Sequence, residues 1–344
     1  MKILFSSHAF YPNLGGLETV SRLLATDFAR AGEDVVLITQ SLGDGTDHEF
    51  PFKIIRRPSV KELIQLITWA DVAFHSNISL RSAWPLLWIR KPWVVAHHIW
   101  LPRGRNLASM KGALKRVVLR SATGIAISQA IARDFTTPCA VIPDPYDDEI
   151  FKILPNIEQD KDLVFVGRFV SDKGLPVLLH ALANLRNQGI APSLTVIGGG
   201  PEEVAWQRLT QDIGLAEQVQ FVGSKRGREL ASELNRHRVL VVPSLWNEPF
   251  GVVALEGMAC GCIVVGSEGG GLTEAIGQAG LTFPNGDADG LAKCLAMALT
   301  DEDVLARCLS AAPAHLTQHR PANVAMRYLE TFARAMYGGP KCLR

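Results

Sequence analysis

The amino-acid sequence predicts an α/β protein built from two doubly wound parallel-sheet domains in tandem. The chain has 344 residues, which suits two domains of ordinary size. Short runs rich in Val and Ile alternate with segments of helical periodicity, as in parallel sheets that helices cover on both faces. This alternation starts afresh after residues 151–162, a polar stretch without clear periodicity that contains Pro155 and is typical of a linker.

The first half of the chain supplies the first alternation. Residues 2–6 form a short apolar run that predicts a strand, and residues 18–31 repeat apolar side chains at helical spacing. Gly32 ends this helix, and residues 34–39 predict the next strand. Further buried strands are expected at residues 71–75, 93–97 and 124–127.

The second half repeats the pattern. Strands are expected at residues 163–166, 193–197, 219–222, 239–242 and 263–266. Helices are expected between them at residues 174–187, 202–214 and 229–236. A last helix, near residues 322–337, is expected to cross back onto the first domain.

These patterns predict how the chain is divided. We expect a first domain at residues 1–158, joined by a C-terminal helix at 322–338, and a second domain at 159–320. The two sheets are expected to face a cleft, because ligands of open α/β sheets bind outside the carboxyl ends of the strands.

Composition excludes several classes of protein. Lys and Arg number 35 against 34 Asp and Glu, and a net charge of +1 gives no strong global field for nucleic acid. The apolar run at the N-terminus is too short for a signal peptide, and charges interrupt the apolar region at residues 82–100. The six cysteines form no Cys-x-x-Cys pair, so we interpret them as small buried residues of a cytoplasmic protein.

A loop that follows a predicted strand carries two cations. Arg168 and Lys173 lie five residues apart between Gly167 and Gly174. Arg can hold phosphate oxygens with two parallel hydrogen bonds, and Lys adds a compact positive charge, so the loop suits a diphosphate. The alternative is a pair of solvated surface cations.

Two glycine-rich loops are less specific. Gly198, Gly199 and Gly200 lie between a strand and a helix, where they allow an anion at the helix N-terminus or form a plain tight turn. Residues 269–271 are also glycines and are followed by Glu274. They predict another loop at the same sheet edge, or a turn with an acidic helix start.

The sharpest signal is a pair of acids in residues 243–261. Glu248 and Glu256 are separated by seven residues, so a helix that begins near Gly251 places one acid before it and the other on it. Two carboxylates so placed can hold a polyol at two points. The free amides of Phe250, Gly251 and Val252 at the helix start can meet phosphate or hydroxyl oxygens.

Together these strings resemble the donor domain of the retaining glycosyltransferases of family four, which have the GT-B fold. In that family a Gly-Arg…Lys-Gly loop, a Glu-x7-Glu stretch with Glu-Pro-Phe-Gly, and a Gly-Gly…Glu loop occur in this order. The resemblance extends to the first half through Gly15 and Gly16 after the first strand and His97 at a strand end. It therefore covers nearly the whole chain.

The resemblance implies roles for residues of the second half. Arg168 and Lys173 would bind the diphosphate of the donor, and Glu256 would hold the ribose hydroxyls. Glu248 would lie beside the donor sugar, near the amides of residues 250–252.

The same resemblance implies further donor contacts. Gly15 and Gly16 would let a loop of the first domain approach the phosphates. Ser224, followed by Lys225, would lie in the nucleobase region.

His97 is the candidate catalytic residue of the first half, with Glu248 its counterpart in the second. It ends a buried strand, and the resemblance implies a hydrogen bond to the donor sugar or orientation of the acceptor. The alternative is a core histidine bonded to the backbone. His98 follows, where the family often has a small or acidic residue. Residues 75–77 end another strand and are candidates for the acceptor side.

A basic segment lies at residues 103–120. It carries six cations and no acid, namely Arg103, Arg105, Lys111, Lys115, Arg116 and Arg120. An apolar stripe runs through it, made of Leu107, Met110, Leu114, Val117 and Val118. A basic amphipathic helix can meet anionic lipid or a phosphorylated acceptor; the alternative is a solvated helix packed by one face. We hypothesise weak contact with the inner face of the membrane.

Two strings fit the Asp-x-Asp pattern of metal-dependent glycosyltransferases, residues 287–289 and 301–303. Both precede predicted helices, so we interpret them as helix-capping acids and expect neither metal nor cofactor. The resemblance then implies transfer of a sugar from a nucleotide donor, UDP in preference to GDP, to an acceptor hydroxyl with retained configuration. Glycan, glycolipid or polysaccharide biosynthesis is the expected setting.

Three other classes remain as alternatives. A nucleotide-sugar epimerase or hydrolase can share this fold. A dinucleotide oxidoreductase would need a G-x-G-x-x-G string after the first strand, and none follows Ser6. An inactive binding subunit is opposed by the intact set of cations and acids.

Overall fold

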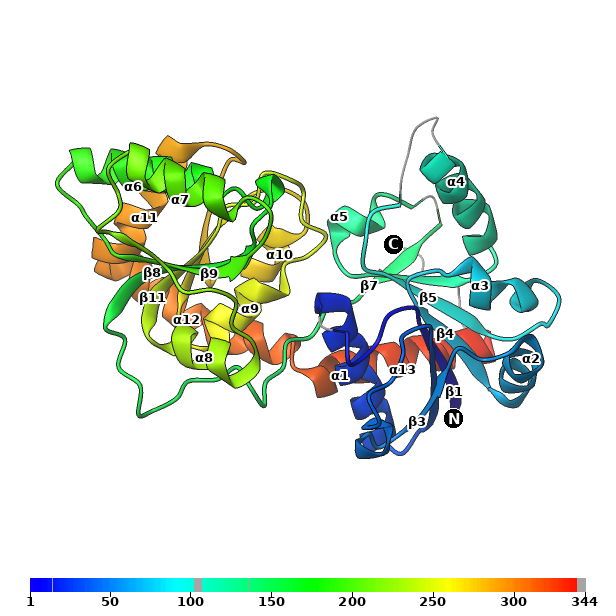
Figure 1. Ribbon diagram of the computed structural model, residues 1–344. Helices are drawn as coiled ribbons and strands as arrows, with labels where there is room; N and C mark the ends of the chain where they lie inside the picture. Colours follow the sequence, from blue (N-terminus) through cyan, green and yellow to red (C-terminus); the bar gives the residue numbers. More distant parts are fainter. Residues whose placement is uncertain (14, 102–106, 136, 339–344) are drawn as a thin grey trace. The chain divides into compact units, whose positions relative to one another are not determined.

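The computed structural model describes residues 1–13, 15–101, 107–135 and 137–338; for 107–109 it describes the backbone alone. The described chain divides into two compact units. The first unit takes Met1–Pro145 and the chain from Arg320 onward, and the second takes Tyr146–His319. Figure 1 shows each unit as a central sheet with helices on both faces.

The sheet of the first unit has seven parallel strands in the order β3-β2-β1-β4-β5-β6-β7. Its strands are β1 (Lys2–Ser7), β2 (Asp34–Thr39), β3 (Lys53–Arg56), β4 (Val72–Ser76), β5 (Trp93–His97), β6 (Thr123–Ala126) and β7 (Cys139–Val141). Phe5 of β1 pairs with Leu37 of β2 on one side and with Phe74 of β4 on the other.

Helices cover both faces of this sheet. One face packs against α1 (Gly16–Arg30) and α13 (Pro321–Tyr337), with Phe28 and Phe332 in edge-to-face contact at 5.4 Å between ring centroids. The C-terminal helix therefore lies along α1 in the first unit (Figure 1). The helices of the other face are α2 (Val60–Trp69), α3 (Leu80–Ala83), η2 (Trp84–Leu87) and α4 (Leu107–Leu119). The short segments η1 (Asp47–Glu49) and α5 (Gln129–Ala132) complete the unit.

The second unit has a six-stranded parallel sheet in the order β10-β9-β8-β11-β12-β13. Its strands are β8 (Lys161–Arg168), β9 (Leu194–Gly199), β10 (Val219–Phe221), β11 (His237–Val242), β12 (Ile263–Ser267) and β13 (Gly280–Phe283). Apart from β7, the two sheets follow the same doubly wound order. The two parallel α/β sheets confirm the predicted fold class.

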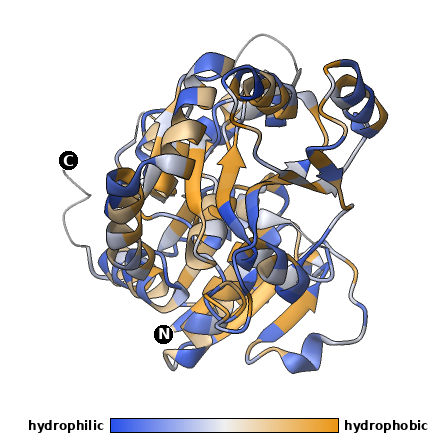
Figure 2. Cartoon of the chain, turned by 90° about the vertical axis from the view of Figure 1, so that its left-hand side faces the viewer, coloured by the Kyte–Doolittle hydropathy of each residue, from blue (hydrophilic) through white to orange (hydrophobic). Residues whose placement is uncertain are grey.

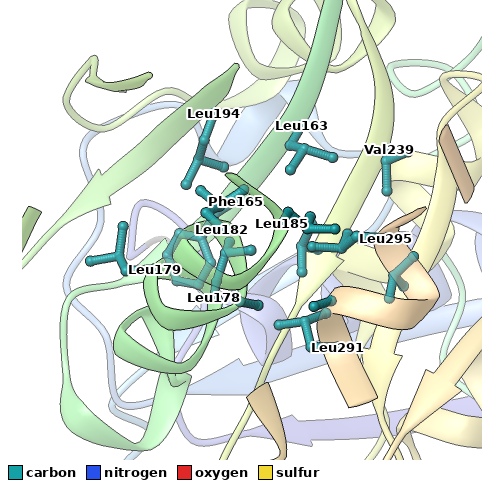
Figure 3. Close-up of a cluster of buried hydrophobic side chains, with 14 of the residues drawn as sticks. Leu163, Phe165, Leu178, Leu179, Leu182, Leu185, Leu194, Val239, Leu291 and Leu295 are labelled. Atoms are coloured by element: carbon teal, nitrogen blue, oxygen red, sulfur yellow. The ribbon is translucent and has the colours of Figure 1, made fainter. Parts of the chain in front are cut away.

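The helices of the second unit are η3 (Ser171–Lys173), α6 (Leu175–Asn187), α7 (Glu203–Asp212), α8 (Gly227–Asn235), α9 (Val252–Ala259), α10 (Leu272–Ile276), α11 (Ala288–Thr300) and α12 (Glu302–Gln318). Figure 3 shows the core where α6 and α11 meet β8, with Phe165, Leu182 and Leu295 packed together. The strands are the most hydrophobic segments, while the helices carry both hydrophilic and hydrophobic residues (Figure 2). This burial fixes the sheet whose carboxyl edge carries the candidate site.

The division between the units lies earlier than the boundary expected at residue 158. The segment before β8 has no periodicity, but hydrogen bonds attach it to the second unit. The side chain of Asn235 accepts from the amide of Leu154 at 2.7 Å and donates to the carbonyl of Lys152 at 3.0 Å. Gln159 donates to the carbonyls of His237 and Gly261. Residues 151–162 are therefore part of the second unit and do not form a free linker.

Candidate functional site

The candidate site lies where the strand order of the second sheet reverses. β8 pairs with β9 on one side and with β11 on the other. The chain thus runs from β8 toward one edge of the sheet through β9 and β10, and then crosses to the other side of β8 to form β11. Such a reversal opens a crevice outside the carboxyl ends of the two central strands, where ligands of open α/β sheets bind. The Arg168–Lys173 loop follows β8, and the loop with Glu248 follows β11.

These two loops are in direct contact through their backbones. The amide of Leu245 donates to the carbonyl of Asp172 at 2.8 Å. Gly174 lies against the carbonyl of Pro243 with φ of +68°, and a Cβ at this position would overlap that oxygen. Glycine is therefore needed here both for its left-handed backbone and for the close approach.

Lys173 and Glu248 meet in this contact. The ammonium of Lys173 lies 2.6 Å from Oε1 of Glu248, and the Ser244 hydroxyl donates to the same oxygen at 2.7 Å. The Lys173 ammonium also lies 5.6 Å from the centroid of the Trp246 ring. The Lys173 side chain is 24% exposed and that of Glu248 is 9% exposed, so the pair is held at the floor of the site with its cation partly open to solvent.

The loop of residues 269–271 supports Glu248 from the other side. The amide of Gly271 donates to the carbonyl of Glu248 at 2.7 Å, and Gly270 forms an isolated parallel bridge with Glu248. Gly270 has φ of +74°, and a Cβ there would overlap the same carbonyl. The predicted loops after β8, β11 and β12 therefore converge on one place, and the glycines of the third position the Glu248 backbone.

Unbonded amides face the same region at the start of α9. Gly251 precedes the first helical residue, Val252, close to where the sequence predicts the helix start. Among the described residues, the amides of Phe250, Gly251 and Val252 donate no hydrogen bond. Free N–H groups at a helix start carry partial positive charge and can receive anionic or hydroxyl oxygens.

Arg168 is the last residue of β8. Its side chain is exposed and makes no ion pair or hydrogen bond within the part of the chain that the structure describes. The guanidinium is therefore available to an anion from outside.

Glu256 lies on α9 and is half-buried. Burial, reinforced by the charge of Asp147, raises the pKa of the Glu256 carboxyl from 4.5 to about 7. No hydrogen bond or ion pair holds this carboxyl among the described residues. A carboxyl so placed can accept hydrogen bonds from the hydroxyls of a ligand, since such hydrogen bonds stabilise its ionised form.

The glycines at 198–200 have a structural role in the second unit. A Cβ on Gly198 would overlap the carbonyl of Gly167, and one on Gly200 would lie 2.6 Å from the carbonyl of Phe169. Glu202 is the N-cap residue of the following helix α7, and its carboxylate accepts a hydrogen bond from the Trp206 indole at 3.1 Å, so an acid lies at this helix start. Of the two readings of this loop, the structure favours the tight turn: the glycines allow β9 to pass closely by β8.

Ser224 and Lys225 follow β10 beside this loop. Ser224 is exposed, with its hydroxyl near Gly199. The Lys225 ammonium pairs with Glu229 at 2.7 Å and lies 3.9 Å from Glu233. Lys225 is therefore engaged by the helix that follows it.

In the first unit, His97 is buried at the end of β5. Its ring stacks on Phe135 with centroids 3.8 Å apart. Burial, with a smaller effect of His98, lowers the pKa of His97 to about 3. The ring is therefore neutral near pH 7, which suits a hydrogen-bonding role better than proton transfer.

The neighbouring residues are also buried. Nδ1 of His98 lies 2.9 Å from Oδ1 of Asp144, and the amide of His98 donates to the Asn77 side chain at 2.9 Å. His75 is fully enclosed and bonds to Trp93 and Ser82. Residues 75–77 thus organise the interior at the end of β4.

The remaining predicted positions have clear local settings. Gly15 precedes α1 in extended conformation, and open space surrounds Gly16, where the helix begins. Asp287 accepts from the amide of Gly290, and Asp301 accepts from those of residues 303 and 304. Both aspartates cap helices, as predicted.

The basic segment forms α4, although Arg103 and Arg105 lie outside the described residues. Met110, Leu114 and Val117 are 66%, 52% and 58% exposed, while Val118 and Leu119 are buried against the sheet. Since positions 110, 114 and 117 share one face of a helix, α4 presents an apolar stripe to its surroundings.

Comparisons with known proteins give the family. The family described as "Glycosyl transferases group 1" matches residues 147–315, nearly all of the second unit. The second unit is therefore similar to that family, in agreement with the resemblance inferred from the sequence.

Curated relatives match about half of this chain. The D-inositol 3-phosphate glycosyltransferase of Stackebrandtia nassauensis is 35% identical over 185 residues, 51% of this chain and 42% of that protein. The glycogen synthase of Mycobacterium tuberculosis is 35% identical over 158 residues, 45% of this chain and 38% of that protein. The matched part of this chain spans less than half of these relatives.

Solved structures give the fold. A glycosyltransferase from Rickettsia africae matches with a TM-score of 0.81 over 98% of this chain and 99% of its own, at 16% identity. HepE of Anabaena, in complex with UDP and glucose, matches with a TM-score of 0.77 over 97% of this chain and 99% of its own, at 20% identity. The fold is GT-B, as the sequence predicts.

None of the described helices is both long enough and apolar enough to cross a membrane.

The raised pKa of Glu256 predicts how stability changes with pH. Between pH 4.5 and about 7 the unfolded chain releases this proton and the folded chain keeps it, so ionisation of Glu256 weakens folding as pH rises. Glu256→Gln removes this effect. We expect the free energy of unfolding of the variant, relative to that of the native protein, to be larger at pH 8 than at pH 5. Urea unfolding at both pH values measures this difference. Glu217→Gln, an exposed change in the same unit, is the control. An equal gain at pH 5 and pH 8 would show that Glu256 does not carry the effect.

Proposed function

We propose that this protein is a retaining glycosyltransferase that moves a sugar from a nucleotide-diphosphate sugar to an acceptor hydroxyl. One observation supports the proposal: the three predicted loops converge at the β8–β11 reversal, where Lys173 pairs with Glu248, the amides of residues 250–252 are unbonded, and Arg168 ends β8. A diphosphate is the ligand that such a set of cations and free N–H groups suits.

The electrostatics of the set support a leaving diphosphate. When the bond from sugar to phosphate breaks, negative charge grows on the leaving oxygens, and preorganised donors stabilise it. Arg168 is unpaired within the described chain, and Lys173 is already held in place by Glu248 and Trp246. Little reorientation is then needed as the charge develops.

Glu248 supports the retaining outcome that the resemblance implies. One of its oxygens accepts from both Lys173 and Ser244, which makes this carboxylate a poor nucleophile. We therefore assign to Glu248 a contact with the donor sugar. The leaving phosphate would take the proton of the acceptor hydroxyl, which attacks the sugar from the same face that the phosphate leaves. His97, neutral and buried, is assigned a hydrogen bond to the donor sugar or the acceptor.

The remaining donor contacts follow the same logic. Glu256 is assigned to the ribose hydroxyls, Ser224 to the nucleobase region, and Gly15 with Gly16 to the phosphates. We propose UDP as the nucleotide, in preference to GDP. HepE of Anabaena, which shares the fold, has been solved in complex with UDP and glucose. The alternative is a nucleotide-sugar epimerase or hydrolase, which would convert the donor without an acceptor.

The proposed roles of Arg168 and Lys173 predict that UDP binds more weakly when either cation is removed. Arg168→Ala and Lys173→Ala each remove a charged hydrogen bond worth about 1.5–3 kcal/mol, so the Kd for UDP should rise at least tenfold. Isothermal titration calorimetry measures this, with Arg208→Ala, an exposed change in the same unit, as the control. Unchanged UDP affinity in both variants would contradict the assignment of the phosphate site.

Metal independence is part of the proposal, since Asp287 and Asp301 already serve as helix caps. Cations and helix amides would neutralise the diphosphate instead. We expect UDP to bind with the same affinity in excess EDTA and in added Mg²⁺, measured by the same calorimetry. A Kd that falls tenfold or more on addition of Mg²⁺ would overturn this part.

We also propose that α4 contacts the cytoplasmic face of an anionic membrane. The support is the exposed stripe of Met110, Leu114 and Val117 together with the neighbouring Lys111 and Lys115. Apolar side chains flanked by lysines favour the boundary between headgroups and acyl chains.

This contact predicts vesicle binding that depends on the stripe. The native protein should float with vesicles containing anionic phosphatidylglycerol at low salt, and Leu114→Glu should abolish flotation. Leu309→Glu, at an exposed site of the second unit, is the matched control. Failure of the native protein to float would disprove membrane contact and leave the UDP experiments unaffected.

A further inference from the structure

A polar cavity lies within the first unit, where the strand order of its sheet reverses. β1 is flanked by β2 and β4, so this is the same kind of crevice as in the second unit. The cavity has a volume of about 40 Å³ and is lined by the ends of β1 and β2 and by the segment after β4. None of the residues that line it is acidic.

The polar residues that line the cavity differ in their exposure to solvent. Ser6 and Ser82 are 5% and 9% exposed, whereas His8 and Arg81 are exposed. Arg81 makes no hydrogen bond or ion pair within the described part of the chain. The cavity therefore has buried hydroxyls inside and an uncommitted guanidinium at its edge.

A chain of hydrogen bonds leads to these hydroxyls from the interior. The indole N–H of Trp93, which can only donate, bonds to Nδ1 of His75 at 3.1 Å. Nδ1 must therefore accept, which leaves the proton of this neutral ring on Nε2. Burial lowers the pKa of His75 to about 3, in keeping with a neutral ring. Nε2 lies 3.1 Å from the Ser82 hydroxyl and donates to it.

The direction of this chain continues to Ser6. With His75 as its donor, Ser82 can send its own proton to Ser6 at 2.9 Å, a shorter contact than the 3.4 Å to the carbonyl of Ser79. The Ser6 hydroxyl has no other hydrogen-bond partner among the described residues. Its proton is then free to point into the cavity, so that a buried donor and the Arg81 guanidinium face the same space.

We propose that this cavity binds a phosphate monoester carried by the acceptor. Arg81 would hold two phosphate oxygens with its planar fork, and Ser6 would donate to another. The lack of acids in the lining favours an anion over a cation. As an acceptor subsite, the cavity rests on the proposed glycosyl transfer; phosphate binding itself can be tested separately.

The size of the cavity agrees with this ligand. At about 40 Å³ it offers the room of roughly three water molecules. The free oxygens of a phosphate group can replace such waters and keep their hydrogen bonds. Pro58 and Leu63 add an apolar wall that can meet the C–H groups of a polyol beside the phosphate.

The test measures phosphate binding to the full chain by calorimetry. Arg168→Gln and Lys173→Gln are introduced together first, so that the proposed diphosphate site does not contribute. Inorganic phosphate and glucose 6-phosphate are the two probes. We expect both to bind this background and Arg81→Gln to weaken both at least tenfold. Arg90→Gln, an exposed arginine outside the cavity, should leave both unchanged.

Ser6→Ala tests the hydrogen-bond chain in the same background. We expect it to weaken both probes about tenfold, with thermal unfolding monitored to confirm that the unit stays folded. If this variant unfolds, Arg81→Gln still decides, because its side chain is exposed.

Three outcomes would overturn the proposal. They are no phosphate binding to the background, binding that Arg81→Gln leaves intact, and binding of inorganic phosphate without glucose 6-phosphate. A native protein that fails to bind UDP would instead disprove the donor site and leave the phosphate result standing.

Discussion

The reversal of strand order is the constraint on which both candidate sites depend. In each sheet the chain leaves the first central strand, β1 or β8, toward one edge and later returns on its other side. The loops after the two central strands thereby lead to helices on opposite faces of the sheet and leave a crevice at its carboxyl edge. In the second unit that crevice holds Lys173 and Glu248. In the first it holds the cavity of Ser6 and Arg81. The helices and buried strands serve chiefly to hold these edges in register.

Close backbone approach decides how the second crevice is built. Gly174 lets the loop after β8 touch the loop after β11, and Gly270 lets the loop after β12 touch Glu248. Each contact would be blocked by a single Cβ. The ion pair of Lys173 and Glu248 therefore lies in a rigid frame, in which a partly exposed ammonium is fixed beside free helix amides. A frame of this kind holds charge without reorganisation, which is what stabilisation of a leaving anion requires.

Sequence patterns predicted the central strands better than the edges. β2 and β5 were expected with the bounds that the structure gives them, because buried parallel strands are continuous apolar runs. β3, β7 and β13 were missed, and each lies at an edge of its sheet, where one flank lacks a neighbour and the apolar signal is weak. Residues 151–162 were interpreted as a linker because they lack periodicity. The distant Asn235 nevertheless accepts from the Leu154 amide, and Gln159, within the segment, donates to the carbonyl of His237. Local periodicity carries no information about such contacts.

The sequence by itself determined the fold class, the order of the loops and the residue types at the candidate donor site, because strand patterning and motif spacing are local properties. Only the tertiary structure decided which of these residues meet. It pairs Lys173 with Glu248 and stacks the buried His97 on Phe135. It also brings Gly198 and Gly200 so close to the backbone of residues 167 and 169 that a Cβ would not fit. It also linked Trp93 and His75 to Ser82 and Ser6, four residues spread over four separate segments. The direction of a hydrogen-bond chain and the pKa of a buried group depend on neighbours distant in sequence, so folding alone assigns them.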